Sequence, residues 1–132
     1  MKRMVALVCL LSIVVAGFSG CASTQIATDT NGLSLSDNGA TNVAHVQGTI
    51  TGFYFLGKKP LLTAKIEGLP DDFGTDTANI RTLVWLLSKT AQDEGASKII
   101  DLQTQASSTV LLYPIPFLFS MKRVSGSANG VK

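Results

Sequence analysis

Residues 42–56 read NVAHVQGTITGFYFL, and the rest of the domain can be placed around this stretch. It is rich in β-branched and aromatic residues, which favour β-strands. Because side chains alternate along a strand, Val46, Ile50 and Tyr54 share one face with Gly48 and Gly52. Two glycines four residues apart on one face indicate either a bulge or the close approach of a packed helix. The stretch therefore predicts a long strand with one apolar face.

Residues 78–94 supply a helix for that face. Apolar residues recur there at helical spacing and form one stripe: Ile80, Leu83, Val84, Leu87 and Ala91. Either Asp76 or Thr77 is expected to cap the first turn, and Gly95 is expected to follow the last one. We expect this stripe to pack against the strand.

The other strands are less strongly marked. Residues 57–60 predict a turn, and residues 61–66 fit either a short strand or the start of a helix. Residues 97–110 and 117–131 read as two further strands, joined by a proline-containing apolar connection. The predicted fold is α+β: a small antiparallel sheet of three to five strands packed on one α-helix, forming a single domain over residues 42–132.

The N-terminus carries an export signal. Lys2 and Arg3 precede an apolar run that is too short for an ordinary membrane span, and small residues then lead into Cys21. Residues 18–21, FSGC, resemble a bacterial lipobox, in which the cysteine thiol receives a diacylglycerol and becomes the new N-terminus. This resemblance predicts that residues 1–20 are removed and that Cys21 is the lipid-attachment residue. The alternative is an ordinary signal peptide cut after Ala22, which would leave a secreted, non-lipidated domain.

Residues 21–41 are dominated by Ser, Thr, Asn, Asp and Gly. No period of 2 or 3.6 runs through them, so they predict a flexible tether behind the lipidated cysteine, with a span of about 25 Å. In an alternative interpretation, Leu33 and Leu35 add a short edge strand. Alanine after Cys21 is similar to the sorting pattern that sends lipoproteins to the outer membrane, so we expect the domain to face the periplasm or the cell surface.

Charge and cysteine content exclude several classes of protein. Lys2 and Arg3 account for the whole formal net charge of +2, so the mature chain is balanced and shows no basic patch for nucleic acid. Cys9 lies in the leader, which leaves no cysteine pair for a disulfide in the mature chain. The expected membrane partner is reached through the acyl chains on Cys21.

Two apolar features are candidate contact sites. Trp85 and Leu86 widen the helix stripe, and they either pack at the margin of the core or meet another subunit or partner. The connection LLYPIPFLFSM at residues 111–121 either folds back over the core or forms an exposed tip that enters lipid or a partner's groove. The candidate contacts in this connection are Leu112, Tyr113, Ile115, Phe117 and Leu118. Lys122 and Arg123 beside it are expected to face water and would favour an anionic surface.

The sequence contains no clear motif for metal binding or catalysis. Glu67, Asp71, Asp72 and Asp76 lie in a loop, but their spacing does not match that of an EF-hand, so we expect a solvated loop and no metal or other cofactor. The single histidine, His45, comes early in the first long strand without a recognisable nucleophile motif. We therefore predict that the protein is not an enzyme and has no catalytic residues.

The order of elements, together with EGASKII at residues 94–100 and LLYPIPF at residues 111–117, resembles small bacterial lipoproteins of the TRL-like and Bor families. This resemblance implies a compact α+β domain on a lipid anchor at the cell envelope. The chain departs from Bor in having no cysteine in the domain. The predicted function is a membrane-anchored envelope lipoprotein with a structural or interaction role, whose partner is an envelope protein or a second copy of the chain. The alternative is a periplasmic binding module for a small apolar ligand.

Overall fold

The computed structural model describes residues 20–29, 39–69, 74–111 and 118–132. In these residues one antiparallel sheet of five strands lies against one helix, which confirms the α+β class, although the domain is mostly sheet. The strand order is β1-β2-β5-β4, and β3 pairs with the end of β2. The elements are β1 (Cys21–Ala27), β2 (Asn42–Phe55), β3 (Lys59–Leu62), α2 (Ile80–Asp93), β4 (Lys98–Val110) and β5 (Phe119–Val131).

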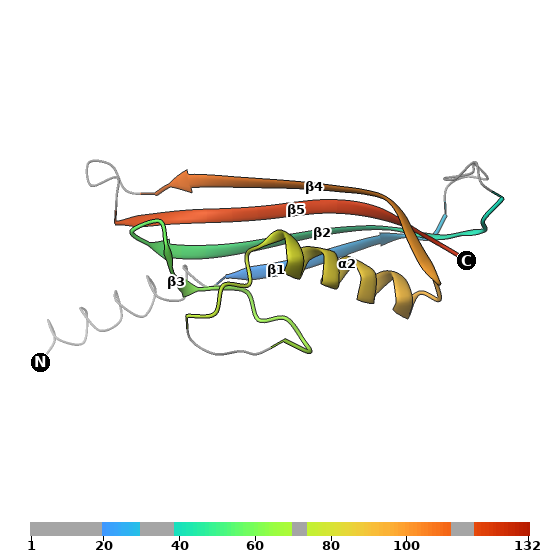
Figure 1. The fold of residues 1–132 in the computed structure, drawn as a ribbon, viewed down its shortest axis with the longest axis horizontal. Helices are drawn as coiled ribbons and strands as arrows, with labels where there is room; N and C mark the ends of the chain where they lie inside the picture. Colours follow the sequence, from blue (N-terminus) through green and yellow to red (C-terminus); the bar gives the residue numbers. More distant parts are fainter. Residues whose placement is uncertain (1–19, 30–38, 70–73, 112–117) are drawn as a thin grey trace, which may run out of the picture.

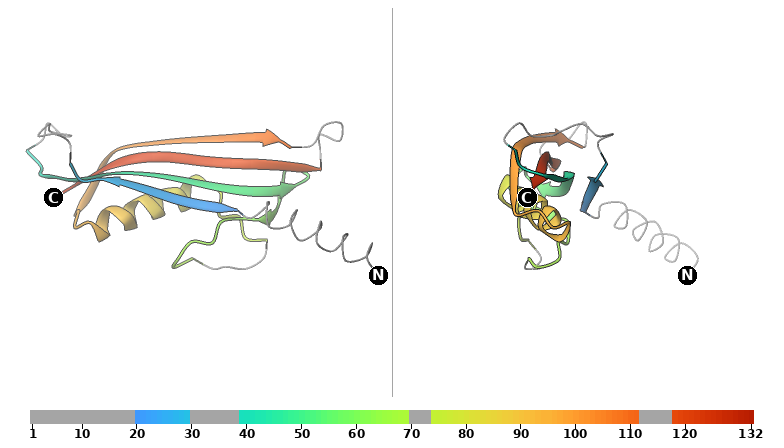
Figure 2. Two further views of the ribbon diagram at one scale, coloured as in Figure 1. Left: turned by 180° about the vertical axis from the view of Figure 1, so that it is seen from behind. Right: turned by 90° about the vertical axis from the view of Figure 1, so that its right-hand side faces the viewer.

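The helix covers one face of the sheet, and the strands curve around it (Figure 1; Figure 2). In the centre of the sheet, β2 and β5 place buried apolar residues side by side, with Val46 opposite Ala128 and Ile50 opposite Val124. Leu83 and Leu87 of α2 are fully buried in the same cluster. The core is therefore the layer between α2 and the two central strands.

Gly48 confirms the expected close approach of the helix. A Cβ atom added there would lie 3.2 Å from Leu87 Cδ2 and 3.3 Å from Leu83 Cδ1. That separation is tighter than ordinary packing, so a side chain at this position would require the Leu83 and Leu87 side chains to shift. The alternative of a bulge at the two glycines is wrong, because the register from Gln47 to Phe55 against β5 is continuous.

The first segment of the predicted tether is instead a strand. Residues 21–27 form β1, and each of them pairs with a residue of β2, from Cys21 opposite Thr51 to Ala27 opposite His45. The sequence CASTQIA carries little hydrophobic signal, and only Ala22 of β1 packs against the core cluster. Hydrogen bonding to a long neighbouring strand gives this segment its structure, which composition alone does not reveal. Residues 30–38, with the alternative edge strand at Leu33 and Leu35, lie outside the described residues.

The helix begins slightly later than predicted, and its cap is a different residue. Asn79 is the N-cap, and its side chain accepts a hydrogen bond of 2.8 Å from the Thr82 N–H. Asp76 and Thr77 are used elsewhere: Asp76 accepts the Tyr54 hydroxyl, and Thr77 donates to the Ala64 carbonyl. The predicted end is confirmed, since Gly95 follows the C-cap with a φ of +90°.

The remaining strands lie close to their predicted positions. The stretch at residues 61–66 resolves into the short strand β3, which begins at Lys59 and ends at Leu62. The strands predicted over residues 97–110 and 117–131 correspond to β4 and β5. The proline-containing connection between them includes residues 112–117, which lie outside the described residues.

Candidate functional site

Cys21 is the first residue of edge strand β1. Its side chain is exposed, and its thiol forms no disulfide. It lies opposite Thr51, on the sheet face that points away from the helix. The predicted lipid-attachment residue is therefore part of the sheet and is not separated from it by a tether.

One end of the sheet brings together a tight turn and the two described flanks of the apolar connection, Leu111 and Leu118. The Leu56 N–H donates to the Leu118 carbonyl at 3.0 Å, and the Leu111 N–H donates to the Phe119 carbonyl at 3.1 Å. The rings of Phe55 and Phe119 lie next to each other there, with centroids 5.9 Å apart. We call this the hairpin end and define it by five exposed residues: Leu56, Lys58, Lys59, Val110 and Leu111.

The hairpin end lies at the same end of the sheet as the start of β1 (Figure 1). Cys21 is opposite Thr51, and β2 continues for only four more residues to Phe55. A β-strand rises about 3.3 Å per residue, so the four residues place the end of β2 about 13 Å beyond Cys21. Of the predicted contacts in the connection, Leu118 is described and half-buried, whereas Leu112, Tyr113, Ile115 and Phe117 lie outside the described residues.

Lys122, predicted to face water, is half-buried. Its Nζ atom lies 4.3 Å from the centroid of the Tyr54 ring, on the helix side of the sheet. Its neighbour Arg123 is exposed, on the opposite face. The two cations are separated because neighbouring residues of a strand point to opposite faces of the sheet.

Tyr54 forms a partly buried polar contact beneath this end. Its ring is fully buried, and its hydroxyl donates to the carboxylate of Asp76. Burial, followed by the hydrogen bond to Asp76, raises the pKa of the Tyr54 hydroxyl well above its usual range. The hydroxyl therefore stays neutral, and its hydrogen bond fixes the loop that contains Asp76 to the sheet.

Trp85 and Leu86 are partly buried and pack against the core cluster. A Cβ atom added at Gly68 would lie 3.0 Å from the Trp85 ring, so the loop before the helix covers part of the indole. Lys89 Nζ lies 5.4 Å from the ring centroid. This placement favours packing at the margin of the core over a contact with a partner.

His45 belongs to a polar chain across three strands. Its Nδ1 lies 2.6 Å from Asn129 Oδ1, and Asn129 Nδ2 donates to Asp101 Oδ2 at 3.0 Å. Asp101 sits at the irregularity between β4 and β5 and has a φ of +52°. The chain joins residues that are far apart in sequence, which spacing could not reveal. It lies on the open face of the sheet, and the partner of His45 is an amide, not a nucleophilic hydroxyl or thiol.

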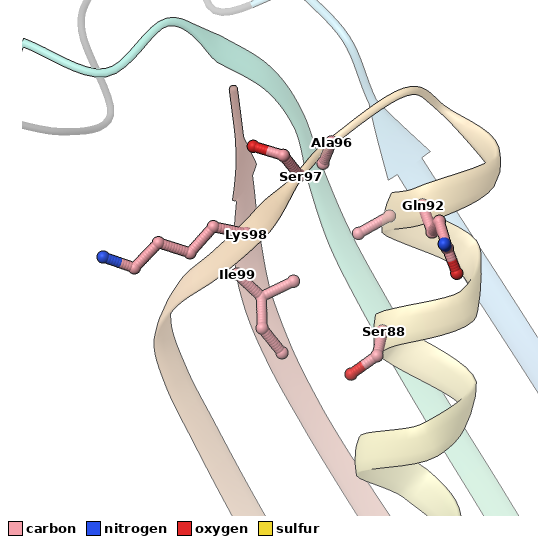
Figure 3. Close-up of a pocket in the computed structure, with 7 residues that line it drawn as sticks. Ser88, Gln92, Ala96, Ser97, Lys98 and Ile99 are labelled. Carbon is pink, nitrogen blue, oxygen red and sulfur yellow. The ribbon is translucent and has the colours of Figure 1, made fainter.

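Among the hollows that border the helix, two lie between α2 and β4. One, of about 310 Å³, lies between the last turns of α2 and the start of β4 (Figure 3). Ser88 and Gln92 line it from the helix and Ile99 lines it from the strand, whereas the Lys98 side chain points away from the helix. The other, of about 400 Å³, is an open groove between the start of α2 and the middle of β4. Ile80, Ala106 and Val124 give this groove an apolar lining.

The predicted acidic loop is only partly described. Asp71 and Asp72 lie outside the described residues, and Asp76 is bonded to Tyr54. In the described part of the chain, no group of three or more His, Cys, Asp or Glu residues is placed to hold a metal ion. Across residues 20–29, 39–69, 74–111 and 118–132, no helix has the length and apolar character to cross a bilayer.

Comparison of the chain with protein-family models, with curated proteins and with solved structures gave no match.

Proposed function

We propose that this protein is an envelope lipoprotein, anchored through Cys21, whose domain has a structural or interaction role at the membrane. The observation that carries this proposal is the position of Cys21 as the first residue of β1. Lipidation and cleavage at the lipobox would make Cys21 the mature N-terminus, so the mature chain would begin where the sheet begins. The leader, the small residues before Cys21 and its exposed thiol are consistent with this processing.

The anchor would hold the domain directly at the bilayer. Two or more acyl chains give stable attachment, whereas a single chain gives only reversible binding. With β1 paired to β2 from Cys21 onward, the sheet cannot float away from the headgroups as it would on a 20-residue tether. We also propose that the anchoring membrane is the outer membrane and that the protein is similar to TRL-like and Bor lipoproteins.

The open edge of β4 supports an interaction role. Within the described residues no strand pairs with the outer side of β4, and its residues 101–110 are all exposed. Between Leu102 and Val110 the strand has no charge, proline or glycine. Natural sheets usually protect their edges with such residues, and an unprotected edge is a common site for the addition of another strand.

Metabolic labelling with a fatty acid, followed by membrane fractionation, tests the anchor. We expect the label to appear on the mature chain and to be lost in Cys21→Ser, which should accumulate as unprocessed precursor. Cys9→Ser is the matched control, because this cysteine lies in the leader and its loss should leave labelling unchanged. Normal processing of Cys21→Ser without acyl groups would contradict the proposal and favour cleavage after Ala22.

A second candidate function is the binding of a small apolar ligand, favoured by the groove between α2 and β4. Its volume of about 400 Å³ falls within the range of small-molecule sites. Displacement of a fluorescent fatty acid tests this function. Saturable binding that is lost in Ala106→Asp and retained in Ser97→Asp, beside the other hollow, would support it; no saturable binding to the unaltered chain would contradict it.

A further inference from the structure

The hairpin end combines exposed apolar residues with cations. Leu56 and Val110 are each 55 % exposed and Leu111 is 37 % exposed, so this end holds three of the six exposed large apolar residues in the described part of the chain. Lys58 and Lys59 follow Leu56 directly and are also exposed. The strand and turn segments 53–60, 108–111 and 118–123 contain no carboxylate. Asp76 lies on the helix side, where it accepts the Tyr54 hydroxyl.

The turn at this end holds a leucine in an unfavourable backbone conformation. Leu56 has a φ of +51° and Gly57 a φ of +67°, and the Lys58 N–H donates to the Phe55 carbonyl at 3.2 Å. Positive φ at both central residues is the signature of a type I′ turn, in which Asn-Gly is strongly preferred. A leucine at the first of these positions strains the backbone and exposes an apolar side chain. The side chain is 55 % exposed and so buries little apolar surface in return, which points to a role outside the fold.

The anchor geometry brings this end to the bilayer. Cys21 is about 13 Å from the end of β2, measured as four residues of strand. An acylated cysteine lies at the headgroup level, and amphipathic surfaces enter the boundary between headgroups and acyl chains by roughly 5–10 Å. The hairpin end can therefore reach that boundary while Cys21 stays among the headgroups.

We propose that the hairpin end is a second membrane contact, specific for anionic phospholipid surfaces. Leu56, Val110 and Leu111 enter the acyl boundary, and Lys58 and Lys59 lie against the headgroup phosphates. This inference rests on the proposed lipid anchor and adds an orientation to it. The strands run away from the bilayer surface, and the hairpin end faces the lipid. The free C-terminus, at the opposite end of the sheet in Figure 1, then points away from the bilayer.

Depth-dependent fluorescence quenching tests the contact on the full-length lipoprotein in vesicles of phosphatidylcholine and phosphatidylglycerol. In the acylated chain Cys21 is blocked, so Leu56→Cys supplies a single thiol for a bimane label. We expect brominated acyl chains to quench this label strongly. The same label at Thr41→Cys, an exposed position at the other end of the sheet, should not be quenched. Val110→Cys provides a second reporter on β4 and should behave like Leu56→Cys.

Charge reversal tests the lipid specificity. The double variant Lys58→Glu with Lys59→Glu removes two attracted cations and adds two repelled anions, so it should lower the ratio of inserted to free hairpin end by at least about 30-fold on anionic vesicles. Lys98→Glu, an exposed lysine at the far end of β4, is the matched control and should change nothing. Equal quenching on purely zwitterionic vesicles would overturn the anionic specificity.

The mass of the acylated N-terminus, measured on the same samples, separates the two proposals. If Cys21 carries acyl groups and the Leu56 label escapes quenching, the membrane contact is wrong and the anchor stands. If Cys21 carries none, the anchor is wrong. The contact is then tested alone by the salt-sensitive flotation of the chain with anionic vesicles, and a chain that fails to float overturns it.

Discussion

Leu56 is the residue at which stability and the proposed membrane contact conflict. Its φ of +51° costs an L-amino acid with a bulky side chain about 1 kcal/mol relative to the residues that favour this region. Leu56→Asn should therefore raise the free energy of unfolding by up to about 1 kcal/mol, because Asn-Gly suits a type I′ turn. Thermal unfolding of the purified protein measures this. Gly57→Ala, at a φ of +67°, is the opposite control and should lower stability. A lower melting temperature for Leu56→Asn would show that Leu56 contributes to the fold.

Tyr54 makes the stability of the domain sensitive to alkaline pH. Its pKa is raised in the folded state, first by burial and then by the bond to Asp76. Above about pH 10 an unfolded tyrosine ionises while the folded one stays neutral, so the stabilisation present below pH 10 declines as the pH rises. Tyr54→Phe should lose about 1 kcal/mol at pH 7 through the missing hydrogen bond, and should lose less additional stability between pH 9 and 11 than the unaltered chain. Equal pH slopes in urea unfolding would contradict this role.

At the scale of elements, the helix shows how far a single sequence predicts structure. Its stripe correctly identified the buried residues Leu83, Leu87 and Ala91, because periodicity reports on burial. The prediction was wrong for Ile80 in the first turn, which is 48 % exposed, and Val84 is only half-buried. Its cap was misassigned because Asp76, Thr77 and Asn79 are all good cap residues, and tertiary bonds decide among them. The strand β1 was missed because its structure depends on β2, which is distant in sequence. Likewise, the packing of Trp85 against the loop at Gly68 and the chain from His45 to Asp101 depend on long-range contacts.

The cap assignment gives a direct prediction. Asn79→Ala should lower the free energy of unfolding by about 1 kcal/mol, because the Thr82 N–H loses its acceptor. Asn79→Asp keeps an oxygen that accepts this bond and should lose much less. Urea unfolding of the two variants measures the difference, and equal losses would assign the stabilisation to the Asn79 Nδ2 bond with the Asp76 carbonyl instead.

Because one edge of β4 is open, the loss of stability caused by a proline substitution should alternate from one residue of the strand to the next. The Leu111 N–H points to β5, and neighbouring residues of an antiparallel strand alternate, so the Ser107 N–H also points to β5 whereas the Ala106 N–H points outward. Ser107→Pro should therefore cost at least about 1 kcal/mol more than Ala106→Pro, since only Ser107→Pro removes a bond to β5. Thermal melting of the isolated variants checks this order. The reverse order would mean that the outer edge of β4 is already paired.

At the scale of the whole molecule, β1 couples the anchor to the orientation of the sheet. If the lipid sits on the first residue of a paired strand, the hairpin end is held within about 13 Å of the bilayer surface at all times. A weak apolar and cationic contact then acts at a high effective concentration, which allows a few residues to orient the domain. A flexible tether of the predicted length would have lost most of this advantage.

A linker insertion tests this coupling. Ten Gly/Ser residues inserted between Cys21 and Ala22 would span about 17 Å as a flexible chain and leave Ala22–Ala27 free to pair with β2. We expect acylation and thermal stability to be retained, while bromolipid quenching of a label at Leu56→Cys falls because the hairpin end is no longer confined to the surface. The same insertion after Lys132 is the control and should leave quenching unchanged. If the linker after Cys21 preserves full quenching, the hairpin end binds the bilayer without help from the anchor. If quenching is absent with and without the linker, the sheet does not stand on this end.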